Sequence, residues 1–194
     1  PGSRGAHDWP GHPAMVGGSM RARAPVGLML LFLLSGAAGG LAAQSAAGDL
    51  DRNGQLSWAE LEAFQRSLHG RVVYRHNRDS LAPHVFLAVG GGDCEDWANL
   101  TVAFVRYWGW EATVSAWLDQ RSGHAVALVR SPLPTPAGYR TVNLGLIAGN
   151  GVYADPGPWV PVDYEVVGGF SSAISPGMTF AYVIEPETTY GRPM

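Results

Sequence analysis

The chain contains no lysine, so all 13 of its basic residues are arginines. It therefore cannot supply a lysine amine to a reaction, its own cross-linking included. Charge is also scarce: charged residues make up 15% of the chain and the formal net charge is −3. Proteins that bind nucleic acid usually carry a strong basic surface. We therefore expect no nucleic-acid partner.

Cysteine is almost absent, because Cys94 is the only one. A single thiol cannot form an internal disulfide. Cys94 lies in the segment Gly92–Trp97, where a glycine turn opens a predicted helix. Backbone N–H groups and the dipole at a helix N-terminus favour a thiolate, which is the nucleophilic form of cysteine. The alternative is a small buried hydrophobic residue, which is the usual role of a free cysteine.

The first third of the chain predicts an export signal. Met20–Arg23 is basic, Val26–Leu34 is an apolar run, and Ser35–Ala47 is rich in small residues. That order is typical of a signal peptide, with cleavage expected after Ala42 or Ala47. We therefore predict a periplasmic or secreted protein with no stable membrane insertion after cleavage. The alternative is an uncleaved anchor, because no charge follows the apolar run until residue 49.

The length of 194 residues allows one ordinary domain, or a small module joined to a core. The pattern divides the chain into four parts. Residues 1–19 are an extension that can precede the true start, 20–47 are the signal peptide, 48–70 are a calcium loop with its helix, and 71–194 are the core.

The segment Asp49–Glu60 places oxygen-bearing side chains at regular intervals. It resembles the calcium loop of the EF-hand family. Calcium takes about six to eight oxygen ligands, and the resemblance implies that they come from Asp49, Asp51, Asn53, the backbone carbonyl of Gln55, Ser57 and Glu60. Gly54 stands where the loop turns sharply. The predicted cofactor is therefore Ca²⁺.

A helix is predicted directly after this loop. Trp58, Leu61, Phe64 and Leu68 share one helical face, and Gly70 stands just past the end. The chain departs from the EF-hand pattern because the entering helix would fall in the signal segment and no second loop is present, so calcium affinity should be weak. The alternative interpretation is an acidic turn that only caps the helix.

The rest of the chain predicts one long helix followed by an antiparallel sheet. The helix begins at Asp93 and stops at Gly109. Alternating or β-rich segments predict the strands, namely Glu111–Leu118, His124–Val129, Tyr139–Leu144, Val152–Asp155 and Thr179–Ile184. Arg71–Gly92 is interpreted as a connector. The expected fold class is α+β.

Three motifs in this part resemble the transglutaminase-like branch of the papain-like superfamily, and most closely its bacterial cysteine proteinases. They are Gly92–Ala98 at a helix start, Gly123–Val126 at a strand start, and Tyr153–Asp155 at a strand end. The resemblance covers Gly90 to Val167. It implies a papain/transglutaminase-like core in which the nucleophile helix packs on an antiparallel sheet.

The resemblance also implies roles for individual residues. Cys94 attacks a carboxamide carbon, His124 takes and returns the proton, and an acidic residue orients the imidazole. Asp155 is favoured for the acidic residue, and Asp163 is the alternative. In some bacterial members acidic residues beside the nucleophile bind calcium, which would make Asp93 and Glu95 ligands; helix capping is the preferred interpretation.

Two functions follow from these patterns. The first is an exported cysteine peptidase or amidase acting on a protein or peptide, by hydrolysis or by acyl transfer. The alternative is a non-catalytic calcium-binding protein whose papain-like core has become a binding surface. The remaining candidates, His69, His76 and His84, match no position of the pattern and are expected on the surface or in the connector.

Overall fold

The computed structural model describes residues 48–144, 158–174 and 176–184. The predicted signal peptide and the predicted strand at Val152–Asp155 lie outside these residues. The elements are α2 (Trp58–His69), β1 (Val73–Tyr74), α3 (Pro83–Val89), β2 (Gly91–Gly92), α4 (Cys94–Tyr107), β3 (Glu111–Leu118), β4 (Gly123–Arg130), β5 (Val160–Asp163), β6 (Val166–Val167) and β7 (Thr179–Ile184). No helix within the described residues is long and apolar enough to cross a membrane.

Strands β3 to β7 form one antiparallel sheet in the order β6-β5-β4-β3-β7. β3 and β4 pair along their whole length, from Glu111 opposite Arg130 to Leu118 opposite Gly123. The turn between them is held by the Asp119 carboxylate, which accepts the N–H groups of Arg121 and Ser122. The predicted hairpin is therefore confirmed.

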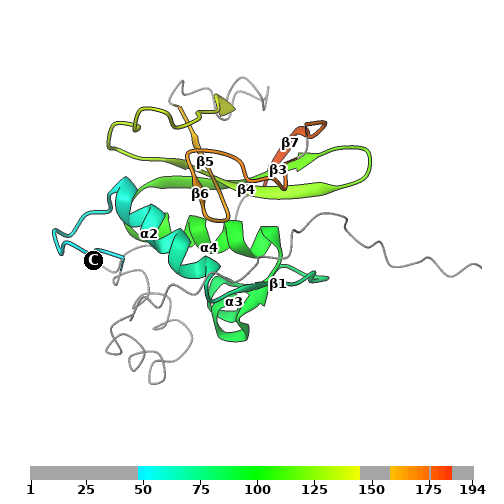
Figure 1. Ribbon diagram of the computed structural model, residues 1–194, viewed down its shortest axis with the longest axis horizontal. Coiled ribbons are helices and arrows are strands. Elements are labelled where there is room, and N and C mark those ends of the chain that lie inside the picture. The colour runs from blue at the N-terminus through cyan, green and yellow to red at the C-terminus, as the bar shows by residue number, and fades with distance from the viewer. Residues whose placement is uncertain (1–47, 145–157, 175, 185–194) are drawn as a thin grey trace, which may run out of the picture. The chain divides into compact units, whose positions relative to one another are not determined.

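Helices α2 and α4 lie on one face of this sheet (Figure 1), with α4 packed against β3 and β4. Side chains alternate between the two faces of a strand, so neighbouring residues of β4 enter different cores. Ala127 and Val129 join the main core with the helices, whereas Leu128 joins a smaller cluster with Leu144 and Trp159. The fold is α+β, with the cysteine helix on an antiparallel sheet.

The two helices are joined by a buried polar network. The Gln65 amide nitrogen donates to Thr101 Oγ1 at 2.9 Å, and the Gln65 amide oxygen accepts from Trp97 Nε1 at 2.8 Å. Gln65 and Thr101 are both fully buried. Because every buried polar atom named here has a partner, the network fixes the register of α2 on α4 without an unpaired group.

The segment from Arg71 to Gly92 was expected to be a connector but carries structure. Strand β1 pairs in parallel with β2, and Pro83 begins the short helix α3. A side chain could not replace the hydrogen of Gly92, because a Cβ there would lie 2.2 Å from Asp96 Oδ2 and 2.7 Å from Phe86 Cδ2. Glycine is thus required where β2 leads into the cysteine helix.

The predicted strand at Tyr139–Leu144 is wrong. Only Val142 pairs there, in an isolated bridge with Trp159. The preceding loop contains three prolines, which cannot donate to a strand ladder, and the N–H of Arg140 bonds instead to the carbonyl of Gly168.

Candidate active site

Cys94 is the first residue of α4, and the local sequence explains why the helix begins there. Asp93 is the N-cap; its carboxylate accepts the N–H groups of Glu95 at 3.0 Å and Asp96 at 3.3 Å. Asp96 returns the contact by accepting the N–H of Asp93 at 2.9 Å, which completes a capping box. The cysteine is partly exposed. A partly exposed thiol at a helix N-terminus is the setting in which cysteines are reactive.

Asp96 also ties the connector to the start of this helix. Its carboxylate is fully buried and accepts hydrogen bonds from the Asn77 side chain and the Leu81 N–H as well as from Asp93. A buried carboxylate is tolerated only when donors surround it. Asp96 therefore fixes the position of Cys94, a role that the sequence pattern did not reveal.

His124 and Asp163 meet on the sheet. His124 is the second residue of β4 and Asp163 is the last residue of β5. His124 Nε2 lies 2.8 Å from Asp163 Oδ1, and the other carboxylate oxygen accepts the N–H of Ser171 at 2.7 Å. His124 is 6% exposed and Asp163 is 2% exposed, so water does not compete for this pair.

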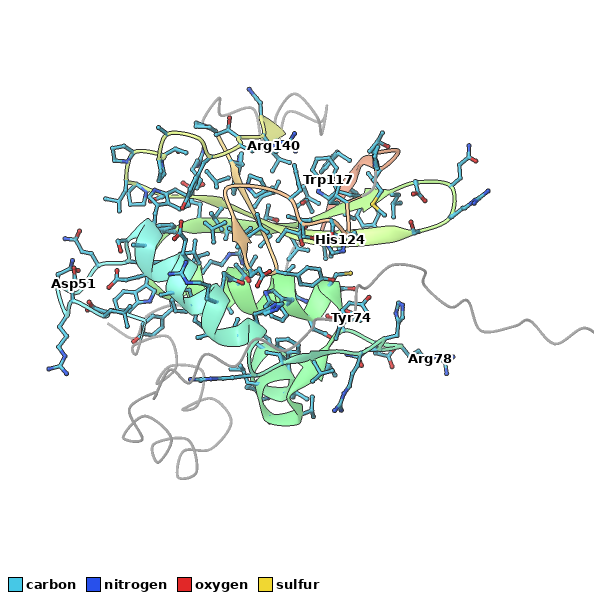
Figure 2. The ribbon with its side chains drawn as sticks, viewed as in Figure 1. Asp51, Tyr74, Arg78, Trp117, His124 and Arg140 are labelled. Atoms are coloured by element: carbon cyan, nitrogen blue, oxygen red, sulfur yellow. The ribbon has the colours of Figure 1, made fainter. Side chains whose placement is uncertain are left out.

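The imidazole also reaches the cysteine. Figure 2 shows His124 on the side of the sheet that faces the helices. Burial alone would lower the pKa of His124, but hydrogen bonds to Asp163 and to the Cys94 side chain, together with their negative charge, raise it to about 9. Because Nε2 is taken by Asp163, Nδ1 is the ring atom left for the sulfur. Cys94, His124 and Asp163 therefore form one connected group.

The structure describes only one of the two candidates for the acidic partner. Asp155, the favoured residue, lies outside the described residues, whereas Asp163, the alternative, is hydrogen bonded to His124. Two of the other histidines, His69 and His76, have different partners. His69 pairs with Glu165 at 3.2 Å on the surface, and the His76 ring lies 5.6 Å from that of Tyr74.

The predicted calcium loop brings three carboxylates together. Asp49, Asp51 and Glu60 each offer one oxygen, and these oxygens lie within 4.8 Å of one another. Backbone N–H groups hold them there: Asp49 accepts from Asn53 and Gly54, and Glu60 accepts from Leu50. Although burial opposes it, hydrogen bonds from Ser57, Leu50 and Asp51 hold the pKa of Glu60 below its usual value. This donor set suits a hard cation such as Ca²⁺.

The loop is also anchored to the rest of the protein. Ser57 caps α2 and forms a capping box with Glu60, so the last predicted calcium ligand is part of the helix start. Leu56 is 2% exposed and packs in the main core, and Trp58 Nε1 donates to the carbonyl of Pro134 at 3.0 Å.

The residues beside the nucleophile give no comparable cluster. Within the part of the chain that the structure describes, Asp49, Asp51 and Glu60 are the group of acidic, histidine or cysteine side chains that could hold a metal. Burial, and the charges of Asp93 and Asp96, raise the pKa of Glu95, against the effect of its hydrogen bond to Ser80. The geometry of Asp93 supports the capping interpretation.

Comparisons with known proteins give a faint likeness. No protein-family model matches the chain, and no curated protein matches it. Calcium-bound LapG of Legionella pneumophila is a solved structure of similar fold. The identity is 16%, the TM-score is 0.45, and the match covers 78% of this chain and 74% of LapG. The function must therefore be argued from this chain's own residues.

Two tyrosines near the group were not predicted from the sequence. Tyr164 follows Asp163, and its ring lies 5.2 Å from that of His124. Tyr74, on β1, lies 6.4 Å from Tyr164. Burial and the negative charges of Cys94 and Asp93 raise the pKa of Tyr74 to about 12, so its hydroxyl stays protonated. No spacing rule identifies these residues, because folding alone brings β1 and the β5–β6 turn to Cys94.

The raised pKa of His124 predicts how stability depends on pH. Its folded value of about 9 lies above the ordinary 6.5, so the stabilisation is fully present below pH 6.5 and is lost as pH rises through 9. The shift corresponds to a free energy of unfolding on the order of 3 kcal/mol. Urea unfolding should show this loss between pH 6.5 and 9.5. No lysine titration can overlap with this loss, because the chain has no lysine. The loss of stability should disappear in His124→Gln. An equal loss in that variant would contradict the prediction.

Proposed function

We propose that this protein is an exported cysteine peptidase or amidase that uses Cys94, His124 and Asp163 and holds Ca²⁺ in the loop Asp49–Glu60. The observation that carries the proposal is the single imidazole that hydrogen bonds to both a helix-start cysteine and a buried carboxylate. A nucleophile, a base and a residue that orients the base are the parts that covalent catalysis requires.

The first step is attack on an amide. The raised pKa of His124 favours an imidazolium beside a Cys94 thiolate. The sulfur attacks the carbonyl carbon, and the carbonyl oxygen becomes negatively charged. Backbone N–H groups at the start of α4 supply positive potential near that oxygen.

The second step releases the amine. The carbon–nitrogen bond breaks as the imidazolium gives its proton to the leaving nitrogen, which leaves a thioester on Cys94. Asp163 holds Nε2–H throughout, so that Nδ1 carries the transferred proton. Neutral His124 then takes a proton from water, and the hydroxide displaces the sulfur. An amine in place of water would give acyl transfer.

Calcium, when bound, supplies charge neutralisation to the loop and no step of the reaction. Asp49, Asp51 and Glu60 would hold it by side chain, with Asn53, the Gln55 carbonyl and Ser57 as further oxygen donors. Because the loop leads directly into α2, and α2 is joined to α4 through Gln65, the ion would stabilise the layer that carries Cys94.

The proposal is tested by the pH dependence of Cys94 alkylation with iodoacetamide. Wild-type protein should react rapidly at pH 6 to 7, because the imidazolium keeps the sulfur ionised. An ordinary cysteine reacts only near its pKa of about 8.5. Mass spectrometry of the alkylated peptide gives the rate, and Cys94→Ser is the blank. A thiol that reacts only above about pH 8.5 would instead identify a non-catalytic calcium-binding protein.

Calcium binding is tested by thermal unfolding. Extracellular calcium modules have dissociation constants of about 10⁻⁴ to 10⁻³ M. At 5 mM Ca²⁺, a constant of about 0.5 mM adds about 1.4 kcal/mol of stability, which raises the melting temperature by roughly 3 to 6 °C. A chelator should remove this increase in the wild-type protein.

Glu60→Gln and Glu111→Gln provide the comparison. Glu60→Gln should melt at the same temperature with and without calcium, since the loop loses a carboxylate. Glu111 lies at the start of β3, away from the loop sequence, and pairs with Arg130, so Glu111→Gln should keep the calcium effect. An unchanged melting curve for the wild-type protein would exclude the stabilising role.

A further inference from the structure

The turn between β5 and β6 has an unexpected residue. Asp163 pairs with Val166, so Tyr164 and Glu165 form a two-residue hairpin turn. Such turns need a positive φ and prefer glycine, asparagine or aspartate. Tyr164 has a φ of 52°, and among the described residues the other non-glycine residue with positive φ is Arg52. A bulky aromatic residue in this region is strained, and strain of this kind is concentrated at functional sites.

The Tyr164 ring is packed among the residues of the candidate site. Its centroid lies 5.2 Å from that of His124, with the two planes tilted by 52°. It meets Trp97 of α4 edge-on at 5.4 Å and Tyr74 edge-on at 6.4 Å. One side chain thus connects the base, the nucleophile helix and β1.

We propose that Tyr164 is a positioning residue, which presses its ring against the His124 imidazole and keeps Nε2 on Asp163 and Nδ1 toward Cys94. The proposal rests on the function proposed above. It explains why the turn accepts a strained tyrosine directly after the acidic residue: the left-handed backbone at 164 turns the chain back toward β6 while the ring stays on the imidazole.

The contacts support this role over simple space filling. A half-turn of the imidazole about its Cβ–Cγ bond would put carbon atoms, Cδ2 and Cε1, where Nδ1 and Nε2 now face Cys94 and Asp163. The tilted Tyr164 ring, which lies 5.2 Å from the imidazole and is itself packed against Trp97, opposes that rotation. Burial and the negative charges of Cys94, Asp163 and Asp93 raise the pKa of Tyr164. Its hydroxyl therefore stays neutral beside the charged pair.

The test compares Tyr164→Asn with Tyr164→Phe in the full chain. Asparagine suits the turn but has no ring, whereas phenylalanine keeps the ring and the strain. In Tyr164→Asn the rate of Cys94 alkylation by iodoacetamide at pH 6.5 should fall about 10-fold. The pKa of His124, followed by NMR of ¹⁵N-histidine-labelled protein, should fall from about 9 toward 6.5. Tyr164→Phe should keep both values.

Each outcome decides the proposal. The proposal is overturned if Tyr164→Asn keeps the wild-type alkylation rate and the wild-type His124 pKa. It is also overturned if both values fall in Tyr164→Phe, because that variant keeps the aromatic ring. If Tyr164→Asn does not fold, Tyr164→Leu takes its place, because leucine has no aromatic ring. The same decreases in alkylation rate and in His124 pKa are expected. A wild-type Cys94 that is unreactive at pH 6 to 7 contradicts the proposed function alone, since the His124 titration still reports on Tyr164.

Discussion

Replacing His124 with alanine is expected to lower the rate of Cys94 alkylation at pH 6.5 by about 100-fold. In the proposed mechanism, the positive charge of the imidazolium that hydrogen bonds to Cys94 favours the thiolate. Without it the sulfur becomes an ordinary thiol, and at pH 6.5 a thiol with a pKa of about 8.5 is only about 1% thiolate. Iodoacetamide reacts with the thiolate, so the rate follows that fraction. The measurement is the rate as a function of pH from 5 to 10.

The shape of the pH profile shows whether the loss of rate comes from protonation of the sulfur. In His124→Ala the rate should recover to the wild-type value above about pH 9, because any thiol ionises there. A misfolded variant would expose an ordinary thiol with the same titration, so circular dichroism checks that His124→Ala is folded. His69→Ala is the matched control, because His69 pairs with Glu165 on the surface, and it should react like the wild-type protein. A His124→Ala profile that overlays the wild-type one would remove the imidazole from the mechanism.

Local signals predicted much of the fold. The helix at Cys94 is confirmed because its start depends on neighbours in sequence: Asp93 caps it, and Gly109 ends it with a φ of 80°. The strand Thr179–Ile184 is confirmed with the same bounds. In each case the residues that decide the element are within a few positions of it.

Elements that depend on distant partners were missed. Strand β1 is two residues long and exists because Val73 and Tyr74 pair with Gly91 and Gly92. Helix α3 has seven residues and no side-chain cap, which leaves a weak helical signal. Such short elements are stabilised by tertiary contacts rather than by their own propensity.

The sequence predicted two residues of the candidate site but could not decide on the third. Cys94 begins α4 and His124 is the second residue of β4, each in a clear sequence pattern, and the structure connects them. The acidic partner could not be chosen from sequence, because Asp155 and Asp163 both end a strand-like run. Pro161 also weakened the second run, since proline is rare inside a sheet. The β4–β5 pairing, which places Asp163 beside His124, is a tertiary property.

Asp163→Asn is therefore the variant that decides the acidic partner, and it should lower Cys94 alkylation at pH 6.5 by at least about 10-fold. Asp163 accepts two hydrogen bonds, from His124 Nε2–H and from the N–H of Ser171. An amide has one oxygen, so it can serve only one of these donors. If that oxygen stays on Ser171, the amide NH₂ faces the ring, Nε2 must accept, and the proton moves to Nδ1. An Nδ1–H cannot take a proton from the cysteine, and this wrong tautomer costs serine proteases about 10⁴-fold in turnover.

Asp155→Asn is the comparison, because both aspartates were candidates and the substitution is the same. With Asp163 as the partner, Asp155→Asn should alkylate at the wild-type rate, and its His124 pKa should stay near 9. The same titration should give a lower value in Asp163→Asn, since the negative charge that stabilises the imidazolium is gone. Circular dichroism of both variants checks that they are folded. If the slow variant proves to be Asp155→Asn while Asp163→Asn reacts normally, the buried His124–Asp163 pair is structural and the residue that orients the base lies at 155.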